Sequence, residues 1–192
     1  DFNNIPVSEG EMLSDIVSAI FAWEIPMTQL PNFLVTTVEA DTSRHSTAQP
    51  QFIQRQINLQ DYAKQSDKGL IVYFYPKDNS SGCSVQAQGF SQHLTQLQQL
   101  GYQVIGVSRD SVKSHEKFIT NKQINFALVS DTDEQLCQYF GIIAEKKLYG
   151  KVSLGVVRST LIFDNTGKLV YEMRNVRAKG HMDKLLAVLP TL

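Results

Sequence analysis

The stretch Leu70–Tyr75, LIVYFY, is a continuous apolar and aromatic run. Such a run is typical of a β-strand that is buried on both faces. A turn follows it, then a helix from about Cys83 to Leu100, then a second buried strand over Gln103–Ser108, QVIGVS. Strand, helix and strand within about forty residues predict a βαβ unit with parallel strands and a right-handed crossover.

Downstream of this unit, helix and strand signals continue to the C-terminus. Asp110 is expected to cap a helix over residues 111–121, and Asp131 with Glu134 to open another that ends at Gly141. The other expected elements are a short strand over Phe126–Val129, hairpin strands over Val156–Phe163 and Lys168–Met173 around the turn Asp164–Gly167, and a final helix over Gly180–Leu189. A βαβ unit followed by a hairpin and a helix is the thioredoxin arrangement. The sequence therefore predicts an α/β thioredoxin fold with a central mixed sheet flanked by helices.

The N-terminal part carries additional elements. Residues 1–29 are expected to form a helical extension, and residues 30–192 the thioredoxin-fold domain. Within residues 8–23 the apolar side chains repeat at helical spacing on one face, which fits a helix that packs on the domain's own core or contacts a second subunit. Alternating patterns predict strands over Asn32–Val38 and Gln51–Ile57, joined by a polar loop.

Composition excludes several classes of function. The chain has 192 residues, 42% of them apolar, and a formal net charge of -1. A chain of this size is expected to form one domain, and its balanced charge provides no basic surface for nucleic acid or an anionic membrane. Its apolar runs are too short to span a bilayer, and its first residues lack the pattern of a secretory signal. We therefore predict a cytoplasmic protein with no nucleic-acid and no membrane partner.

Cys83 and Cys137 are the two cysteines of the chain, too few for a disulfide framework and too far apart for a C-x-x-C motif. Cys83 falls in the first turn of a predicted helix, where unpaired N–H groups and the helix dipole favour thiolate over thiol. A buried structural cysteine is the ordinary alternative. Cys137 lies between Leu136 and Phe140, which is typical of a packed cysteine on an apolar helix face; a resolving role for Cys137 is the less favoured alternative. The four histidines show no metal-ligand spacing and are expected on the surface or on helix faces, so no metal is predicted.

The residues before Cys83 carry a more specific pattern. Pro76, Ser80 and Cys83 stand in the order P-x-x-x-S-x-x-C, which resembles the peroxiredoxin signature P-x-x-x-[TS]-x-x-C. Residues 57–189 are similar to the bacterioferritin-comigratory, or PrxQ, branch of the peroxiredoxins through the stretches YFYPKDNSSGC, VIGVSRDSVKSH, VSDTDEQLC, LYGK and RSTLIFDNTGKL. The resemblance implies the thioredoxin fold with N-terminal additions, and it implies that Cys83 is the peroxidatic cysteine.

The same resemblance implies roles for three further residues. Ser80 would hydrogen-bond the thiolate and the incoming peroxide, and Pro76 would limit water access and shape the turn. Arg158 would stabilise the thiolate and the charge on the departing oxygen. An ordinary outward-facing strand arginine is the alternative for Arg158, and Arg109, near the end of another strand, is the second candidate.

Two positions depart from the family pattern. Gln88 stands five residues after Cys83, where members with a resolving cysteine in the same helix have that cysteine, and Ser81 replaces the proline of the usual T-P-G-C. Ser81 is expected to loosen the turn without removing the nucleophile. Because Gln88 stands in place of that cysteine and Cys137 is expected to be packed, we predict a one-cysteine cycle, in which an external thiol of the thioredoxin, glutaredoxin or glutathione type reduces the oxidised Cys83.

The leading hypothesis is a thiol-dependent peroxidase that reduces hydrogen peroxide and organic hydroperoxides through a Cys83 sulfenic acid, without a cofactor, as a monomer or weak homodimer. One alternative is a thiol–disulfide oxidoreductase on the same fold, which the lack of C-x-x-C disfavours. Another is a non-catalytic thioredoxin-fold interaction module, which the joint presence of Pro76, Ser80, Cys83 and Arg158 disfavours.

Overall fold

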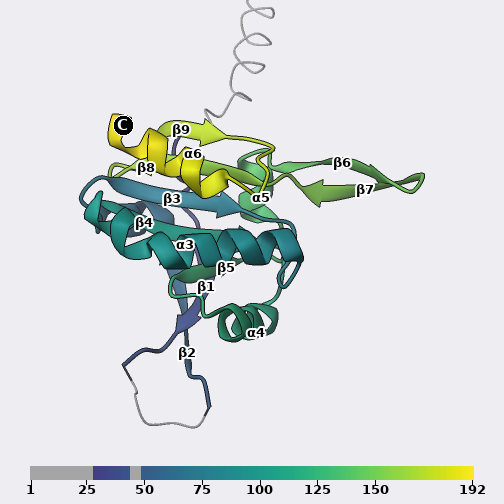
Figure 1. Cartoon of the computed structure of the whole chain (residues 1–192), viewed down its shortest axis with the longest axis horizontal. Helices are drawn as coiled ribbons and strands as arrows, with labels where there is room; N and C mark the ends of the chain where they lie inside the picture. The colour runs from purple at the N-terminus through teal and green to yellow at the C-terminus, as the bar shows by residue number, and fades with distance from the viewer. Residues whose placement is uncertain (1–27, 44–48) are drawn as a thin grey trace, which may run out of the picture.

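A computed structural model describes residues 28–43 and 49–192 of the chain (Figure 1). The strands are β1 (Leu34–Ala40), β2 (Phe52–Asn58), β3 (Gly69–Phe74), β4 (Tyr102–Ser108), β5 (Ala127–Ser130), β6 (Ile143–Leu148), β7 (Lys151–Val156), β8 (Ser159–Asp164) and β9 (Leu169–Met173). The helices are α2 (Leu59–Lys64), α3 (Ser81–Gln99), α4 (Val112–Lys122), α5 (Gln135–Tyr139) and α6 (His181–Val188), and a 3-10 turn follows at Leu189–Thr191.

A mixed sheet forms the centre of the described part, with the strand order β2-β1-β5-β4-β3-β8-β9. Strands β3, β4 and β5 run parallel to one another, whereas β1, β8 and β9 pair with their neighbours in antiparallel fashion. Every residue of β3 is buried, because β4 and β8 flank it and helices cover both of its faces. The βαβ unit and the mixed thioredoxin-fold sheet that the sequence predicts are confirmed.

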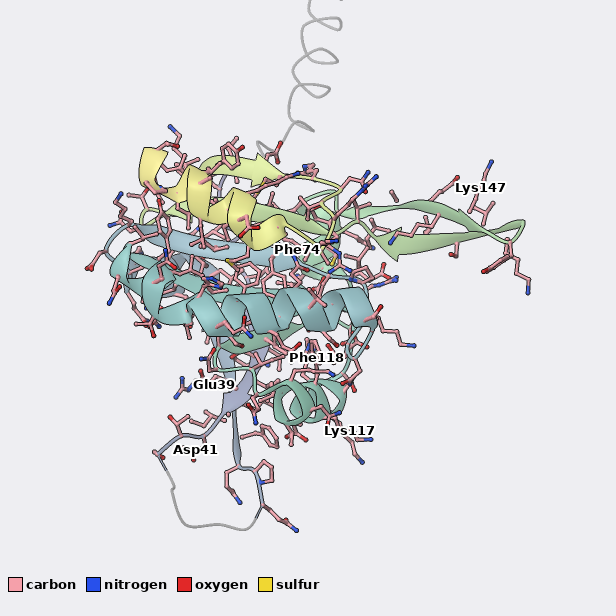
Figure 2. The ribbon with its side chains drawn as sticks, viewed as in Figure 1. Glu39, Asp41, Phe74, Lys117, Phe118 and Lys147 are labelled. Carbon is pink, nitrogen blue, oxygen red and sulfur yellow. The ribbon has the colours of Figure 1, made fainter. Side chains whose placement is uncertain are left out.

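The two faces of the sheet support separate cores. Alternate residues of β3 point to opposite faces, so Tyr73 and Tyr75 join one core and Phe74 joins the other. Helices α3, α4 and α6 cover the first core, and α2 and α5 contribute to the second. Figure 2 shows the helix α4 in this packing: Phe118 is fully buried, whereas Lys117 is exposed.

The helix boundaries differ in detail from the expectation. Helix α3 begins at Ser81, two residues earlier than predicted. Helix α4 is capped by Ser111, whose hydroxyl accepts from the N–H of Ser114. Asp110, the predicted cap, instead accepts from the N–H of Asp78, because the chain brings its carboxylate to the loop after β3.

The segment after Gly141 differs more. The predicted strand Val156–Phe163 is broken at residues 157–158, so that β7 ends before the break and β8 begins after it. Strand β7 pairs with β6 in a separate two-stranded sheet, which projects away from the rest of the molecule with Lys147 on it (Figures 1 and 2). The short helix α2, Leu59–Lys64, is a second element that the sequence pattern does not predict. Both misses lie in short or polar segments without a clear hydrophobic period.

The predicted N-terminal helix over residues 8–23 lies outside the described residues. Gln29, near the start of the described residues, forms an antiparallel β-bridge with Lys168. Within residues 28–43 and 49–192, none of the helices has the length and apolar character that a membrane crossing needs.

Candidate active site

Cys83 lies at the positive end of α3, directly after the loop that leaves β3. Ser80 is the N-cap residue with an extended backbone, and Cys83 is therefore the third residue of a 19-residue helix. The N–H groups of a first helical turn have no partner within the helix and stabilise negative charge nearby. Because Cys83 is only 1% exposed, its sulfur feels these groups with little screening by bulk water.

Arg158 brings a full positive charge to the sulfur. Its Nη2 donates a hydrogen bond to Cys83 Sγ over 3.3 Å. The sheet register explains the contact: Phe74 at the end of β3 pairs with Ser159 at the start of β8, so Arg158 stands beside the loop that carries Cys83. The guanidinium thus points to the thiol and not outward to solvent.

Gln86 holds the other arm of the guanidinium. It follows Cys83 by about one helical turn, is 3% exposed, and accepts a hydrogen bond from Arg158 Nη1 through Oε1 over 2.6 Å. Because a guanidinium is planar and rigid, fixing one terminal nitrogen also directs the other. Gln86 and Cys83 together therefore define the position of the charge.

Gly82 leaves the room that this arrangement needs. A Cβ atom at Gly82 would lie 3.3 Å from Arg158 Nη2 and 3.6 Å from the Ala178 Cβ. The first distance is tighter than ordinary van der Waals contact, so a side chain there would displace the guanidinium. Glycine at this position lets Arg158 lie against the backbone of the first helical turn.

Ser80 and Pro76 line the same loop. The Ser80 hydroxyl donates to the backbone carbonyl of Lys77 over 3.1 Å, within the loop itself. Its oxygen keeps free lone pairs, and rotation about the Cα–Cβ bond would redirect its proton. Pro76 is half-buried at the start of the loop, and it has no N–H group that would need a partner there.

A buried acid–histidine pair fixes the middle of the loop. Asp78 Oδ2 lies 2.9 Å from His115 Nδ1 on α4, and both side chains are at most 2% exposed. His115 Nε2 lies 3.0 Å from the carbonyl oxygen of Val129, which can only accept, so Nε2 carries a proton. Tyr75 and Ser114 donate further hydrogen bonds to the Asp78 carboxylate at 2.8 Å each. Helix α4 thus holds the loop between β3 and α3, residues 75–80, through a network of hydrogen bonds to Asp78.

Cys137 is on the other side of the sheet. It belongs to the core with Phe74, whereas Cys83 belongs to the core with Tyr73 and Tyr75. Burial, with the nearby Asp131 carboxylate as a second cause, raises the pKa of the Cys137 thiol well above its ordinary value. Both causes favour the thiol form of Cys137 over the thiolate, which is the nucleophilic form of cysteine.

Arg109, the second candidate for the charge beside Cys83, is engaged elsewhere. Its Nη1 forms a 2.8 Å ion pair with Glu134 Oε1, at the start of α5. The hydrogen bond from Arg109 is the main cause that lowers the pKa of the Glu134 carboxyl. In the described part of the chain, no three His, Cys, Asp or Glu side chains gather as a metal site requires.

Comparison with known proteins places this geometry in a family. The model of the AhpC/TSA family matches residues 28–172. Peroxiredoxin Bcp of Xanthomonas campestris is 45% identical over 120 residues, which are 62% of this chain and 75% of that protein. Peroxiredoxin Bcp of Escherichia coli is 35% identical over 131 residues, 68% of this chain and 82% of that protein. The chain belongs to the AhpC/TSA family and is a peroxiredoxin.

Solved structures agree with this assignment. A structure of peroxiredoxin Q from Xanthomonas campestris, with one cysteine replaced by serine, is 36% identical and has a TM-score of 0.70; the match covers 85% of this chain and 96% of that one. A second, of the Xanthomonas campestris bacterioferritin comigratory protein, is 41% identical with a TM-score of 0.65 and covers 71% and 85% of the two chains. This peroxiredoxin is accordingly an oxidoreductase of the thiol peroxidase class, and the non-catalytic alternative is not favoured.

Sequence reasoning missed several residues of the peroxiredoxin site. Gln86, Asp78 and His115 were not singled out, and two of the four histidines, His115 and His181, are buried within hydrogen-bonded networks. Gln86 could have been found, because it lies three residues after Cys83 on the same helix face. His115 and His181 gave no such signal, since both reach the site from helices distant in sequence.

Proposed function

We propose that Cys83 is the peroxidatic cysteine and that Arg158 is the residue that activates it. The contact of 3.3 Å between Arg158 Nη2 and Cys83 Sγ carries this proposal. A cation at this distance, in a site shielded from water, stabilises the thiolate over the thiol. Thiolate is the form of cysteine that attacks an O–O bond.

The reaction follows from this arrangement. The Cys83 thiolate attacks the terminal oxygen of a hydroperoxide, so that an S–O bond forms and the O–O bond breaks. Sulfur is oxidised to a sulfenic acid, and the leaving alkoxide or hydroxide takes a proton and departs as alcohol or water. Negative charge moves from sulfur to the leaving oxygen, and the Arg158 guanidinium and the N–H groups of the first helical turn can stabilise it at both places.

Ser80 and Pro76 have supporting roles in this proposal. Rotation of the Ser80 hydroxyl away from the Lys77 carbonyl would direct it to the peroxide, where it can donate to one oxygen and accept from the other. Pro76, at the start of the loop, presents no backbone donor and helps to exclude water from the thiolate.

The second half of the cycle needs an external thiol. One thiol attacks the sulfenic acid to form a mixed disulfide and water, and a second thiol releases Cys83 by disulfide exchange. Because Cys83 is 1% exposed, the first turn of α3 must open before a reductant reaches its sulfur. We expect a small or flexible thiol donor of the thioredoxin, glutaredoxin or glutathione type to serve.

The proposed substrates are hydrogen peroxide and organic hydroperoxides. The Xanthomonas campestris structure at 41% identity is described in terms of the alkyl peroxide reduction activity of that protein. A hydroperoxide needs only its two oxygens at the Cys83 sulfur, so an alkyl group can remain outside the site. We propose a monomer or weak homodimer as the working form, which sedimentation at two protein concentrations would test.

A peroxide-consumption assay with a dithiol reductant tests the proposal. Cys83→Ser should abolish turnover, because it removes the nucleophile and keeps a small side chain at the start of the helix. Cys137→Ser is the matched control and should retain the activity, because Cys137 lies in the other core. Turnover by the Cys83→Ser variant would contradict the mechanism.

A further inference from the structure

His181 is a buried histidine that contacts the active site from the C-terminal helix. It is the first residue of α6, follows Gly180 with its left-handed φ of 76°, and is 2% exposed. Its Nδ1 lies 3.3 Å from Gln86 Nε2, and its Nε2 lies 2.9 Å from Thr160 Oγ1 on β8. Gln86 in turn accepts from Arg158, so a continuous series of hydrogen bonds leads from β8 to the sulfur of Cys83.

The chemistry of the groups determines the direction of every bond in this series. A guanidinium has no acceptor, so the Gln86 atom 2.6 Å from Arg158 must be the amide oxygen. The amide nitrogen of Gln86 therefore faces His181 and donates to Nδ1, which must carry a lone pair. The single ring proton of a neutral His181 is consequently on Nε2, and it is donated to Thr160.

The surroundings of the ring keep it in this neutral form. Burial, followed by the charges of Arg158 and Lys184, lowers the pKa of His181 to about 4. The ring is packed edge-on against Phe90, with 5.7 Å between the centroids, so it cannot turn freely. At neutral pH the ring therefore presents an unprotonated Nδ1 to Gln86.

We infer that His181 is a positioning residue of the peroxidase site: it orients the Gln86 amide so that its oxygen holds Arg158 with Nη2 on Cys83 Sγ. Without an acceptor at the place of Nδ1, the Gln86 nitrogen has no partner on that side, and the amide is free to flip. A flipped amide presents N–H groups to the guanidinium and repels it. The inference deepens the proposed function and depends on the role given there to Arg158.

Three substitutions separate this role from simple packing. An asparagine side chain places its polar end near the former Nδ1, a glutamine places it near the former Nε2, and phenylalanine fills the space without polar atoms. We expect His181→Asn to keep the rate constant of Cys83 oxidation by hydrogen peroxide within about threefold of the unmodified protein. His181→Gln and His181→Phe should lower it about tenfold, the equivalent of one lost hydrogen bond.

The readouts are single-turnover oxidation of Cys83 by hydrogen peroxide and the pH profile of its alkylation. His181→Phe should shift that profile to higher pH, because a misplaced guanidinium stabilises the thiolate less. His93→Asn is the matched control on α3, since His93 contacts the Gly89 carbonyl within its own helix and, among the residues that the structure describes, stands outside the series. It should change neither readout.

A double-mutant cycle decides whether His181 acts through Gln86. In a Gln86→Met background, His181→Phe should cause almost no further loss of rate, since the amide that His181 orients is gone. The inference is overturned if the decreases in the rate of Cys83 oxidation caused by Gln86→Met and His181→Phe multiply in the double variant. It is also overturned if His181→Asn and His181→Gln decrease that rate equally. If Arg158→Met leaves Cys83 oxidation unchanged, the proposed function itself fails; if Arg158→Met slows it and His181→Phe does not, only the role of His181 fails.

Discussion

Among single residues, Arg158 makes the contact with Cys83 on which the proposed chemistry depends. It donates to Cys83 Sγ and Gln86 Oε1 with two nitrogens of one rigid plane. Arg158→Met should slow peroxide reduction about tenfold or more, because a hydrogen bond to a charged group contributes ~1.5 to 3 kcal/mol. The thiolate fraction at neutral pH should fall as well, as measured by pH-dependent alkylation.

Arg109→Met is the matched control for this substitution. It removes an arginine that pairs with Glu134 and does not contact Cys83, so it should leave alkylation of Cys83 unchanged. Should the Arg158 and Arg109 variants behave alike, a general loss of positive charge would explain the effect, and the specific contact with the sulfur would not be needed.

The absence of a nearby second thiol predicts how Cys83 behaves under excess peroxide. Gln88 occupies the position five residues on, and Cys137 lies across the sheet. A sulfenic acid that meets no internal thiol persists and is oxidised further to sulfinic and sulfonic acid. One equivalent of peroxide should leave a trappable sulfenic acid on Cys83, and excess peroxide should add oxygen there and inactivate the enzyme.

Peptide mass spectrometry follows these products. Gln88→Cys should restore an internal disulfide, after the first turns of α3 unwind to bring the two sulfurs within bonding geometry, and should slow the inactivation. A Cys83–Cys137 disulfide within one chain as the main product of the unmodified protein would refute the one-cysteine cycle.

Among the elements, α4 holds the loop between β3 and α3, residues 75–80, in place. It contributes Ser114 and His115 to the Asp78 carboxylate; the contact with His115 is buried, and the contact with Ser114 is partly buried. Asp78→Asn should reduce the free energy of unfolding by about 3 kcal/mol, because it leaves a buried histidine without its charged partner. It should also slow peroxide reduction, since the loop that leads to Ser80 and to the start of α3, where Cys83 lies, loses its anchor.

Urea unfolding measures the first effect, and an exposed ion pair provides the control. Asp61→Asn removes a carboxylate that pairs with Lys64 on the surface of α2, and it should cost less than about 0.5 kcal/mol. The double variant Asp78→Asn with His115→Gln should lose less stability than the two single losses added together. If the losses in the free energy of unfolding are strictly additive, Asp78 and His115 do not stabilise the protein as a coupled pair.

For the whole molecule, the buried His181 makes stability depend on pH. Burial and the charges of Arg158 and Lys184 lower its pKa to about 4 in the folded protein, whereas it titrates near 6.5 in an unfolded chain. Between these values the unfolded chain binds a proton that the folded chain does not, so the free energy of unfolding falls as the pH falls from about 6.5 to about 4. The loss at the lower end is of the order of 3 kcal/mol.

Urea midpoints at pH 7 and pH 4.5 measure this dependence. His181→Asn removes the titrating group, so the variant should lose less stability between these two values than the unmodified protein does. Equal losses would mean that other groups cause the acid sensitivity and that His181 is not held in its neutral form.

The sequence by itself determined the local features of this protein. The apolar run of β3, the position of Cys83 in the first turn of α3 and the pattern of Pro76, Ser80 and Cys83 are all readable, because each depends on residues close together in the chain. The fold class followed from the order of such elements, and the resemblance of residues 57–189 to known peroxiredoxins indicated Arg158.

Only the tertiary structure decided which distant groups meet. The break between β7 and β8 places Arg158 at the sulfur, α4 brings His115 to Asp78, and α6 brings His181 to Gln86. The fold also separates Cys83 from Cys137, because α3 and α5, which carry them, pack on opposite faces of the sheet. These contacts join residues that are as many as 95 positions apart in the chain. Whether such residues meet depends on the strand register of the whole sheet, and no local sequence pattern determines it.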